Sequence, residues 1–261
     1  MLFRVLKNYL ASDKLDLMSR SADHSPKATA TSQAIFDPRE VPIVSRDSHM
    51  PAIEQALLKP DALRLRFTQE KSWEAEVTDE NRAALAREGS VRAGRGDALT
   101  PAAVLIPLIM YENELKILLT QRTAHLYDHP GQISFPGGRS DPQDSSAIET
   151  ALREAEEEIG LPASRVEVLG SLPHYLTITG YQVTPVVSLV NAGHSYTADE
   201  FEVADIFEVP MEYLMNPHHH EQRMWQSPQG YRRFYAMPYE NKFIWGATAG
   251  MLRNLYHFLK A

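Results

Sequence analysis

Three glutamates around residue 157 have the side-chain type and the spacing to share one cation. Glu154, Glu157 and Glu158 stand at i, i+3 and i+4, so on an α-helix they fall on one side. At about 6 Å and an effective dielectric constant of about 20, each pair of carboxylates repels by roughly 2–3 kcal/mol. A hard cation such as Mg²⁺ or Mn²⁺ prefers oxygen ligands and would relieve that repulsion. The pattern therefore predicts a metal site, although a bare acidic run on a helix more often forms only a solvated face.

The residues that flank the glutamates predict the helix that positions them. Ser146 and Glu149 have the spacing of a capping box, which places the helix start near residue 146. Gly160 is typical of a helix end. Arg153 is expected to pair with Glu157 at i+4. At 100° per residue one side of the helix, expected to pack against a sheet, carries Ile148, Leu152, Ala155 and Ile159.

A glycine turn, an acid and an arginine precede the glutamates at the spacing of a known motif. The stretch reads Gly138, five residues, Asp144, eight residues and then REAEEEIGL, which starts at Arg153. It resembles a Nudix box. An Asp instead of a Glu at position 144, and a gap to the arginine that is one residue longer than in the general pattern, both fit the subgroup of coenzyme A pyrophosphatases.

A second stretch, upstream of the box, also resembles that subgroup. LLTQRTAHLYDHPGQISFPGG at 118–138 follows its signature, except that Thr123 stands where Ser or Ala is usual and Tyr127 where Arg is usual. The resemblance resumes at FEVADIFEVP (201–210) and at IWGATAGML (244–252). Loss of an arginine that contacts the phosphates of the coenzyme would weaken the substrate assignment and leave the hydrolase assignment intact.

The resemblance implies a hydrolase that uses Mg²⁺ or Mn²⁺ to cleave a diphosphate linkage. The expected metal ligands are Glu154, Glu157, Glu158 and the carbonyl of Gly138. Arg153 is expected to orient the glutamates, although an ordinary helix salt bridge is the simpler interpretation. The catalytic base is either a box glutamate, Glu154 or Glu157, or an acid from a later loop. Glu202, which matches the recurrent E-V-x-x-x-F-x-V-P run, is the candidate there, and a surface position on a strand is an equally open interpretation of it.

Four residues between the second predicted strand and the glycine turn are the candidate substrate contacts. Arg122 is suited to bind a phosphate, because a guanidinium pairs with phosphate oxygens. His125 and His129 would contact phosphate or ribose, or only stabilise their loop, and Tyr127 occupies the position of the usual arginine. The triplet His218, His219 and His220 suggests a metal site, but its neighbours indicate an exposed loop instead.

Three functions remain open at this level. The resemblance favours cleavage of coenzyme A or acyl-CoA to 3′,5′-ADP and (acyl-)4′-phosphopantetheine. Tyr127 favours the alternative of a Nudix pyrophosphatase that acts on ADP-ribose or another nucleoside diphosphate derivative. A non-catalytic nucleotide-sensing module would be expected to lose box carboxylates, and all three are present. A structural domain with an acidic helix is the remaining interpretation.

Hydrophobic periodicity predicts mixed strands and a few helices, and hence an α/β or α+β fold. The resemblance narrows this to a Nudix-type α/β/α sandwich, with a mixed sheet and the box helix packed on it. The predicted strands are 102–111, 115–122, 132–138, 165–176, 181–190 and the start of 201–215, and the predicted helices lie within 50–67, 78–89 and 242–259. Thr78 is expected to cap the second helix and Gly89 to stop it. Residues 1–60 are assigned to a partly disordered or loosely helical extension, and 61–261 to the hydrolase domain.

Composition excludes some partners and sites. The 261 residues carry a formal net charge of −8, which argues against a nucleic-acid binder, and no cysteine, which excludes disulfides and thiolate metal sites. No apolar run approaches the ~20 residues of a membrane span. We therefore expect a small-molecule substrate, neither a nucleic acid nor a membrane as partner, and a cytoplasmic location. The resemblance also allows a homodimer, because family members are often dimeric.

Overall fold

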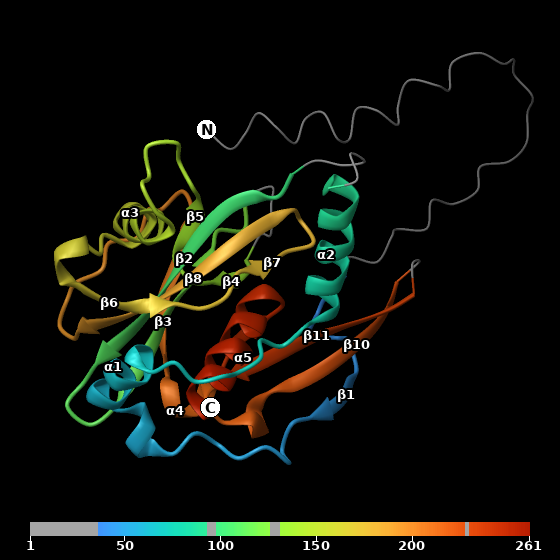
Figure 1. The fold of residues 1–261 in the computed structure, drawn as a ribbon, viewed down its shortest axis with the longest axis horizontal. Helices are drawn as coiled ribbons and strands as arrows, with labels where there is room; N and C mark the ends of the chain where they lie inside the picture. Colours follow the sequence, from blue (N-terminus) through green and yellow to red (C-terminus); the bar gives the residue numbers. More distant parts are fainter. Residues whose placement is uncertain (1–35, 93–97, 126–130, 228–229) are drawn as a thin grey trace, which may run out of the picture. The chain divides into compact units, whose positions relative to one another are not determined.

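The computed structural model describes residues 36–92, 98–125, 131–227 and 230–261 (Figure 1). Tyr127 and His129 lie outside these residues. The chain divides into two units, Met1–Asp37 and Pro38–Ala261, and the second is described here. In the described part of the chain, no helix is both long enough and apolar enough to cross a membrane.

The central sheet is built around two long parallel strands. β2 (Thr100–Met110) runs parallel to β8 (Tyr181–Asn191) over eleven residue pairs. Both strands are almost continuously apolar and buried, as expected for strands covered on both faces. The order is β4-β3-β2-β8-β6, and β5, β7 and β9 pair with β2, β8 and β3. The bounds of these strands are β3 Leu115–Arg122, β4 Ile133–Ser134, β5 Gly137–Arg139, β6 Val166–Ser171, β7 Tyr175–Leu176 and β9 Val203–Pro210.

Helices cover both faces of this sheet. On one face α3 (Ala147–Ile159) packs Ala151, Ala155 and Ile159 against apolar side chains of β2 and β8. On the other face α5 (Ala247–Lys260) packs Leu252 and Leu255 into the larger core cluster. Figure 1 shows α3 and α5 on opposite sides of the sheet. The predicted α/β/α sandwich, with the box helix on a mixed sheet, is confirmed.

A second sheet was not predicted. Its order is β1-β10-β11-β12, all antiparallel, with bounds Ile43–Arg46, Glu221–Ser227, Gly230–Tyr239 and Lys242–Trp245. The prediction of helix from residue 242 was therefore wrong over its first residues. Gly246, at φ 63°, separates β12 from α5, because glycine adopts this left-handed backbone region without steric cost.

Residues 38–60 belong to the compact unit. β1 pairs with β10, and Arg46 Nη2 lies 2.8 Å from Glu221 Oε1. Ile53 and Leu58 are buried in the main core. The sequence assigned these residues to an extension, whereas in the structure the boundary falls after Asp37. We therefore propose that the hydrolase domain begins near Pro38.

The remaining helices are short, apart from α2. They are η4 (Gln55–Leu58), α1 (Pro60–Thr68), α2 (Asp79–Arg92), η5 (Ala163–Arg165), α4 (Met211–Leu214) and η6 (Pro217–His219). The predicted cap at Thr78 is confirmed, since Asn81 N donates to Thr78 Oγ1 at 3.1 Å. The predicted stop at Gly89 was wrong, because α2 continues to Arg92. A glycine inside a helix costs only about 1 kcal/mol relative to alanine, so a helix can run through it.

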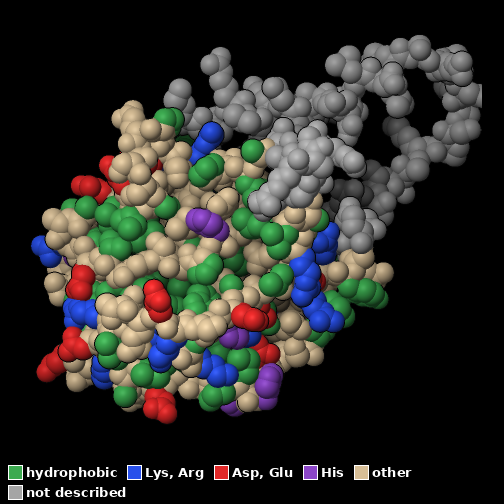
Figure 2. Space-filling model, viewed as in Figure 1, with side chains coloured by type: hydrophobic (Ala, Val, Ile, Leu, Met, Phe, Trp, Pro, Cys, Tyr) green, Lys and Arg blue, Asp and Glu red, His purple; other side chains and the backbone are tan. Residues whose placement is uncertain are grey.

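Charged side chains of both signs are interspersed on the face shown in Figure 2. Apolar and uncharged polar side chains separate most of them, and several Lys and Arg side chains lie close together near the right-hand edge of this view.

Candidate active site

Helix α3 begins and ends where the sequence predicts. The Ser146 side chain accepts from Glu149 N at 3.2 Å, and Gly160 closes the helix in the left-handed region at φ 66°. The capping box differs from the ideal in one contact. The Glu149 carboxylate accepts from Ser145 N and Ser145 Oγ, one residue before the expected partner. These caps fix where the box glutamates lie relative to the sheet.

The two sides of α3 are not divided as the helical wheel predicts. Ala155 and Ile159 pack on the sheet as expected. Ile148, which was expected on the same side, is exposed, and Ala151 is buried near the start of the helix instead. Glu158 is buried, whereas the Glu157 side chain is 61% exposed. The three glutamates, predicted to fall on one side of the helix, therefore differ in how far each is exposed. Glu158 faces the glycine turn because its position on the wheel lies between the apolar and the exposed sides.

Gly138 and Glu154 approach each other more closely than any other residue type at 138 would allow. A Cβ atom added at Gly138 would lie 2.5–2.7 Å from the carboxylate atoms of Glu154. Gly138 sits in β5, paired with Ala103 of β2, so the sheet fixes its backbone. The absence of a side chain there leaves the Glu154 carboxylate directly beside the backbone that was predicted to supply a ligand.

Glu158 is a buried carboxyl group surrounded mainly by like charge. Gly137 N donates to Glu158 Oε2 at 3.2 Å. The pKa of Glu158 is raised to about 8, mainly by burial and also by the negative charges of Glu154 and Glu202, and the Gly137 hydrogen bond and Arg122 act in the opposite direction. Burial is also the main cause of the raised pKa of Glu154, to which Glu157 and Glu202 add. The structure thus brings Glu154, Glu158 and Glu202 within electrostatic reach of one another.

Arg153 joins the box acids into one network. Its Nε and Nη2 atoms each lie 3.0 Å from an oxygen of Asp144, and Nη1 lies 2.9 Å from Glu154 Oε1 and 3.0 Å from Glu157 Oε2. The predicted pairing with Glu157 is confirmed. Hydrogen bonds from Arg153 hold the pKa of Asp144 well below its usual range. Sequence reasoning found Asp144 only as part of the motif and did not identify it as the anchor of the arginine.

Hydrogen bonds attach the turn at residues 199–202 to α3 and to the end of β3. Asp199 N donates to the Glu158 carbonyl at 2.9 Å, and Glu202 N donates to the Asp199 carbonyl at 3.0 Å. Thr123 N donates to the Glu202 carbonyl at 3.0 Å. Glu202, 44 residues after Glu158 in the sequence, is therefore held beside the box helix. Arg122, the last residue of β3, faces the same cluster.

The loop after β3 is described only in part. His125 is exposed, and its ring lies 5.1 Å from the ring of Phe201, measured between centroids, in an edge-on arrangement. The candidate substrate contacts Tyr127 and His129 lie outside the described residues. Phe201 was not named as a site residue from the sequence. A large apolar residue directly before the candidate base was the available signal.

The donors at this site suit a hard divalent cation, although they are not gathered into a finished metal site. Within the described ranges, no three His, Asp or Glu side chains are grouped closely enough to hold a metal ion. Glu157 instead pairs with Arg153. Glu154 and Glu158 are largely removed from water beside Gly138 and repel each other, and a cation would stabilise their ionised forms. Their chemistry therefore fits Mg²⁺ or Mn²⁺.

The histidine triplet has a structural role. His220 is buried and lies 2.8 Å from the Leu214 carbonyl through Nε2 and 3.1 Å from Arg253 Nη1 through Nδ1, and burial lowers its pKa to about 3. His219 stacks on Tyr213 at 3.8 Å between ring centroids. The expectation of an exposed loop was wrong for His220, because its imidazole hydrogen-bonds the backbone of α4 inside the core.

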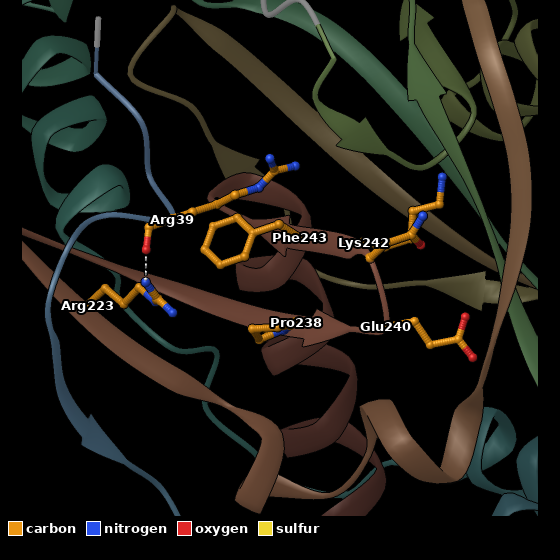
Figure 3. A pocket seen from close by; sticks show the side chains of 7 residues that line it. Arg39, Arg223, Pro238, Glu240, Lys242 and Phe243 are labelled. Atoms are coloured by element: carbon orange, nitrogen blue, oxygen red, sulfur yellow. Dashed lines mark hydrogen bonds between the residues drawn. The ribbon is translucent and has the colours of Figure 1, made fainter. Parts of the chain in front are cut away.

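A cavity of about 350 Å³ lies at the β11–β12 hairpin (Figure 3). Its lining residues are Arg39, Arg223, Pro238, Glu240, Asn241, Lys242 and Phe243. Two of the cations that line it have acidic partners: Arg223 lies 2.6 Å from Glu221, and Lys242 pairs with Asp205. Figure 3 shows the Arg223 guanidinium directed at the backbone carbonyl of Arg39 and the Glu240 carboxylate pointing away from both arginines. None of the box carboxylates lines this cavity, so the candidate site is the carboxylate cluster.

Comparison with known proteins gives one consistent result. The model of the NUDIX domain matches residues 99–243, more than half of the chain. Proteins named uncharacterized Nudix hydrolase NudL, from Yersinia enterocolitica and Yersinia pestis, are 48% identical over 155 residues, which is 59% of this chain and 78% and 77% of theirs. Similar solved structures include an Ap4A hydrolase from C. elegans and a MutT/nudix family protein from Enterococcus faecalis. The Ap4A hydrolase has a TM-score of 0.39 and 17% identity, and the match covers 45% of this chain and 85% of that protein. The Enterococcus faecalis protein also has a TM-score of 0.39, with 14% identity, and the match covers 77% of this chain and 75% of that protein. The domain match and the two NudL relatives show that the chain belongs to the Nudix hydrolase family.

Proposed function

We propose that this Nudix hydrolase cleaves the diphosphate linkage of coenzyme A or acyl-CoA and releases 3′,5′-ADP and (acyl-)4′-phosphopantetheine. Family membership supports hydrolysis of a pyrophosphate bond in a small nucleotide derivative. The observation that supports the finer proposal is that both parts of the coenzyme A signature meet at one carboxyl group. Arg122, from the upstream part, and Gly137, from the FPGG turn, both interact with Glu158 of the box.

In this proposal Glu154, Glu158 and the Gly138 carbonyl hold a divalent cation, and Glu157 joins them from the exposed side of α3. When bound, the cation supplies positive charge that offsets the diphosphate and activates a water molecule. Arg153 keeps Glu154 and Glu157 in place through the network that Asp144 anchors. Because Arg153 pairs with both glutamates, its own part is to position the ligands.

Glu202 is the proposed general base. Hydrogen bonds with Thr123 and Asp199 fix its backbone, and its negative charge raises the pKa of both Glu154 and Glu158. A base held beside the ligands can take a proton from the attacking water. Arg122 would bind a phosphate oxygen of the substrate through its guanidinium. His125, at the exposed edge of the same loop, would contact the ribose or a phosphate, and the proposed contacts also include Tyr127 and His129.

The second candidate substrate is ADP-ribose or another nucleoside diphosphate derivative. The specific observation in its favour is Tyr127, which stands where the coenzyme A subgroup has an arginine. A tyrosine offers one hydroxyl and an aromatic face in place of a fixed positive charge. A substrate without the additional 3′-phosphate of coenzyme A needs less positive charge at its nucleotide end. Restoring a positive charge at position 127 should therefore improve cleavage of coenzyme A and have no effect on cleavage of ADP-ribose.

The test is to measure hydrolysis of coenzyme A, acetyl-CoA and ADP-ribose side by side, with Mg²⁺, with Mn²⁺ and with chelator, and to resolve the products. Metal-dependent release of 3′,5′-ADP from the coenzymes, with ADP-ribose slow, is the expected result. Fast cleavage of ADP-ribose with inert coenzyme A would overturn the substrate and retain the metal site. Tyr127→Arg is the matched variant, expected to raise kcat/KM for coenzyme A and to leave that for ADP-ribose unchanged.

A further inference from the structure

Phe201 is a large apolar side chain that the protein leaves in solvent beside its candidate base. Its relative exposure is 53%, although the adjacent residues Glu202 and Val203 lie in the turn that reaches α3 and in β9. Exposed apolar residues are common when scattered singly over a surface. An exposed apolar side chain that adjoins an active site differs from these, because a bound ligand could contact it.

The backbone of Phe201 is held on both sides by hydrogen bonds. Phe201 N donates to Asp199 Oδ1 at 2.8 Å, and Thr123 Oγ1 donates to the Phe201 carbonyl at 2.8 Å. Thr123 is buried and follows Arg122 directly, so one short segment carries both the phosphate-binding candidate and the support of the aromatic residue. The Phe201 side chain therefore projects into solvent from a fixed backbone.

A second ring supports the first. His125 lies edge-on against Phe201, with 5.1 Å between ring centroids and 61° between ring planes. Both side chains are exposed, so the pair forms a small aromatic surface at the rim of the carboxylate cluster. Aromatic side chains on a fixed backbone next to a phosphate-binding arginine are what a nucleotide needs, since every nucleobase offers a flat π-face for stacking.

We propose that Phe201, supported by His125, is the stacking surface for the nucleobase of the substrate. The proposal rests on the proposed function, because it assigns the nucleoside end of the same diphosphate substrate. Arg122, together with a cation held by the box carboxylates, would bind the diphosphate, and one ribose separates the diphosphate from the base. The base then lies on Phe201, and the other half of the substrate, pantetheine in coenzyme A, extends to the other side.

The two halves of coenzyme A, which are also the two products, test this directly. We expect Phe201→Ala to raise the inhibition constant of 3′,5′-ADP about tenfold or more, which is the loss of one base–aromatic stack. The inhibition constant of 4′-phosphopantetheine should stay unchanged, and KM should rise much more than kcat falls. Phe201→Trp should retain wild-type binding, whereas Phe201→Leu, which keeps apolar bulk without a π-face, should behave like the alanine variant.

The matched control is Tyr231→Ala, another exposed aromatic residue, which lies in β11 of the second sheet. It should change neither constant. An unchanged constant for 3′,5′-ADP in Phe201→Ala would overturn the stacking surface, and so would an equal loss for both products. Turnover by the wild type would leave the proposed function standing in that case. If the wild type cleaves neither coenzyme A nor ADP-ribose, the proposed function fails, and calorimetric binding of AMP to wild type and Phe201→Ala decides the stacking surface independently.

Discussion

At the scale of single residues, the acids of the box have different environments although the sequence presents them as equals. Glu154 lies against the Gly138 backbone, Glu158 is buried, and Glu157 is exposed and paired with Arg153. Their spacing predicted one side of a helix but not the depth of each side chain. Depth depends on the glycine turn and on the turn before β9, which pack over Glu158 from distant parts of the chain. The spacing of residues within the helix carries no information about either.

The first prediction separates a metal ligand from an ordinary helix glutamate. Glu154→Gln removes a charged donor next to Gly138 and should lower kcat by at least about a hundredfold, since metal-assisted charge stabilisation contributes several kcal/mol. Glu156→Gln is the matched control, because Glu156 is an exposed glutamate on the same helix. It should retain activity. Steady-state kinetics at saturating Mg²⁺ and circular dichroism of both variants check this, and similar activity in the two variants would remove Glu154 from the site.

The second prediction concerns pH and the buried carboxyl group. The pKa of Glu158 is about 8 in the folded protein, mainly through burial, whereas an unperturbed glutamate has about 4.5. The folded state therefore holds the proton more tightly than the unfolded state, and this group lowers the free energy of unfolding as pH rises between those two values. In the presence of chelator, the Tm of the wild type should therefore fall between pH 5 and pH 8 by an amount that the Tm of Glu158→Gln does not.

Added Mg²⁺ should reverse that decline. A cation binds the deprotonated carboxylates, so it should raise Tm more at pH 8 than at pH 6. Glu158→Gln should be more stable than the wild type at pH 8 in chelator and nearly inactive, because the change that removes the buried charge also removes a ligand. Equal Tm profiles for wild type and variant in chelator would show that Glu158 does not titrate in this range.

At the scale of elements, local signals predicted the helix and the strands that build the site. The caps of α3 and the continuous apolar runs of β2, β3 and β8 are contained within each segment, so the sequence shows them directly. The second sheet was missed for the opposite reason. The sequence of β10 is polar, although its residues Glu221 and Arg223 are both buried. The two charges can be buried because they neutralise each other and because Arg223 also donates to the carbonyls of Arg39 and Val41. Those partners lie about 180 residues earlier and cannot be inferred from the segment itself.

The third prediction concerns the contact between β5 and α3. Gly138→Ala places a methyl group 2.5–2.7 Å from the Glu154 carboxylate, so the carboxylate must move. We expect kcat to fall by about tenfold or more, since small displacements of catalytic groups are costly, while unfolding changes little. Gly193→Ala is the comparison, because nothing lies within 4 Å of the added atom although its φ of 87° makes the backbone strained. It should cost stability and leave kcat intact, and the opposite pattern would exclude a functional role for the close approach.

At the scale of the whole molecule, the segment before α1 connects parts that are far apart in the chain. Asp47 lies 2.9 Å from Arg253 of α5, and Glu76 lies 2.7 Å from the same guanidinium. Arg253 is 3% exposed, so removal of an acidic partner would leave part of a buried charge uncompensated. Breaking such a pair typically costs about 3–5 kcal/mol. Through Asp47, the segment that sequence analysis separates from the hydrolase domain thus stabilises the helix that covers one face of its sheet.

The fourth prediction follows from this connection and tests where the domain begins. A chain that starts at Pro38 retains β1, Asp47 and the buried Ile53, and should keep the Tm and the kcat of the full chain. A chain that starts at Asp61 loses all three and leaves Arg253 with Glu76 as its one remaining acidic partner among the described residues. It should have a markedly lower Tm or fail to fold. Thermal unfolding of both chains, with Asp47→Asn in the full chain as the single-contact control, separates the loss of β1 from the loss of the ion pair. If the chain that starts at residue 61 is stable and active, the domain begins near residue 61, as sequence composition suggests. That result would show that the fold needs neither β1 nor the contact of Asp47 with α5.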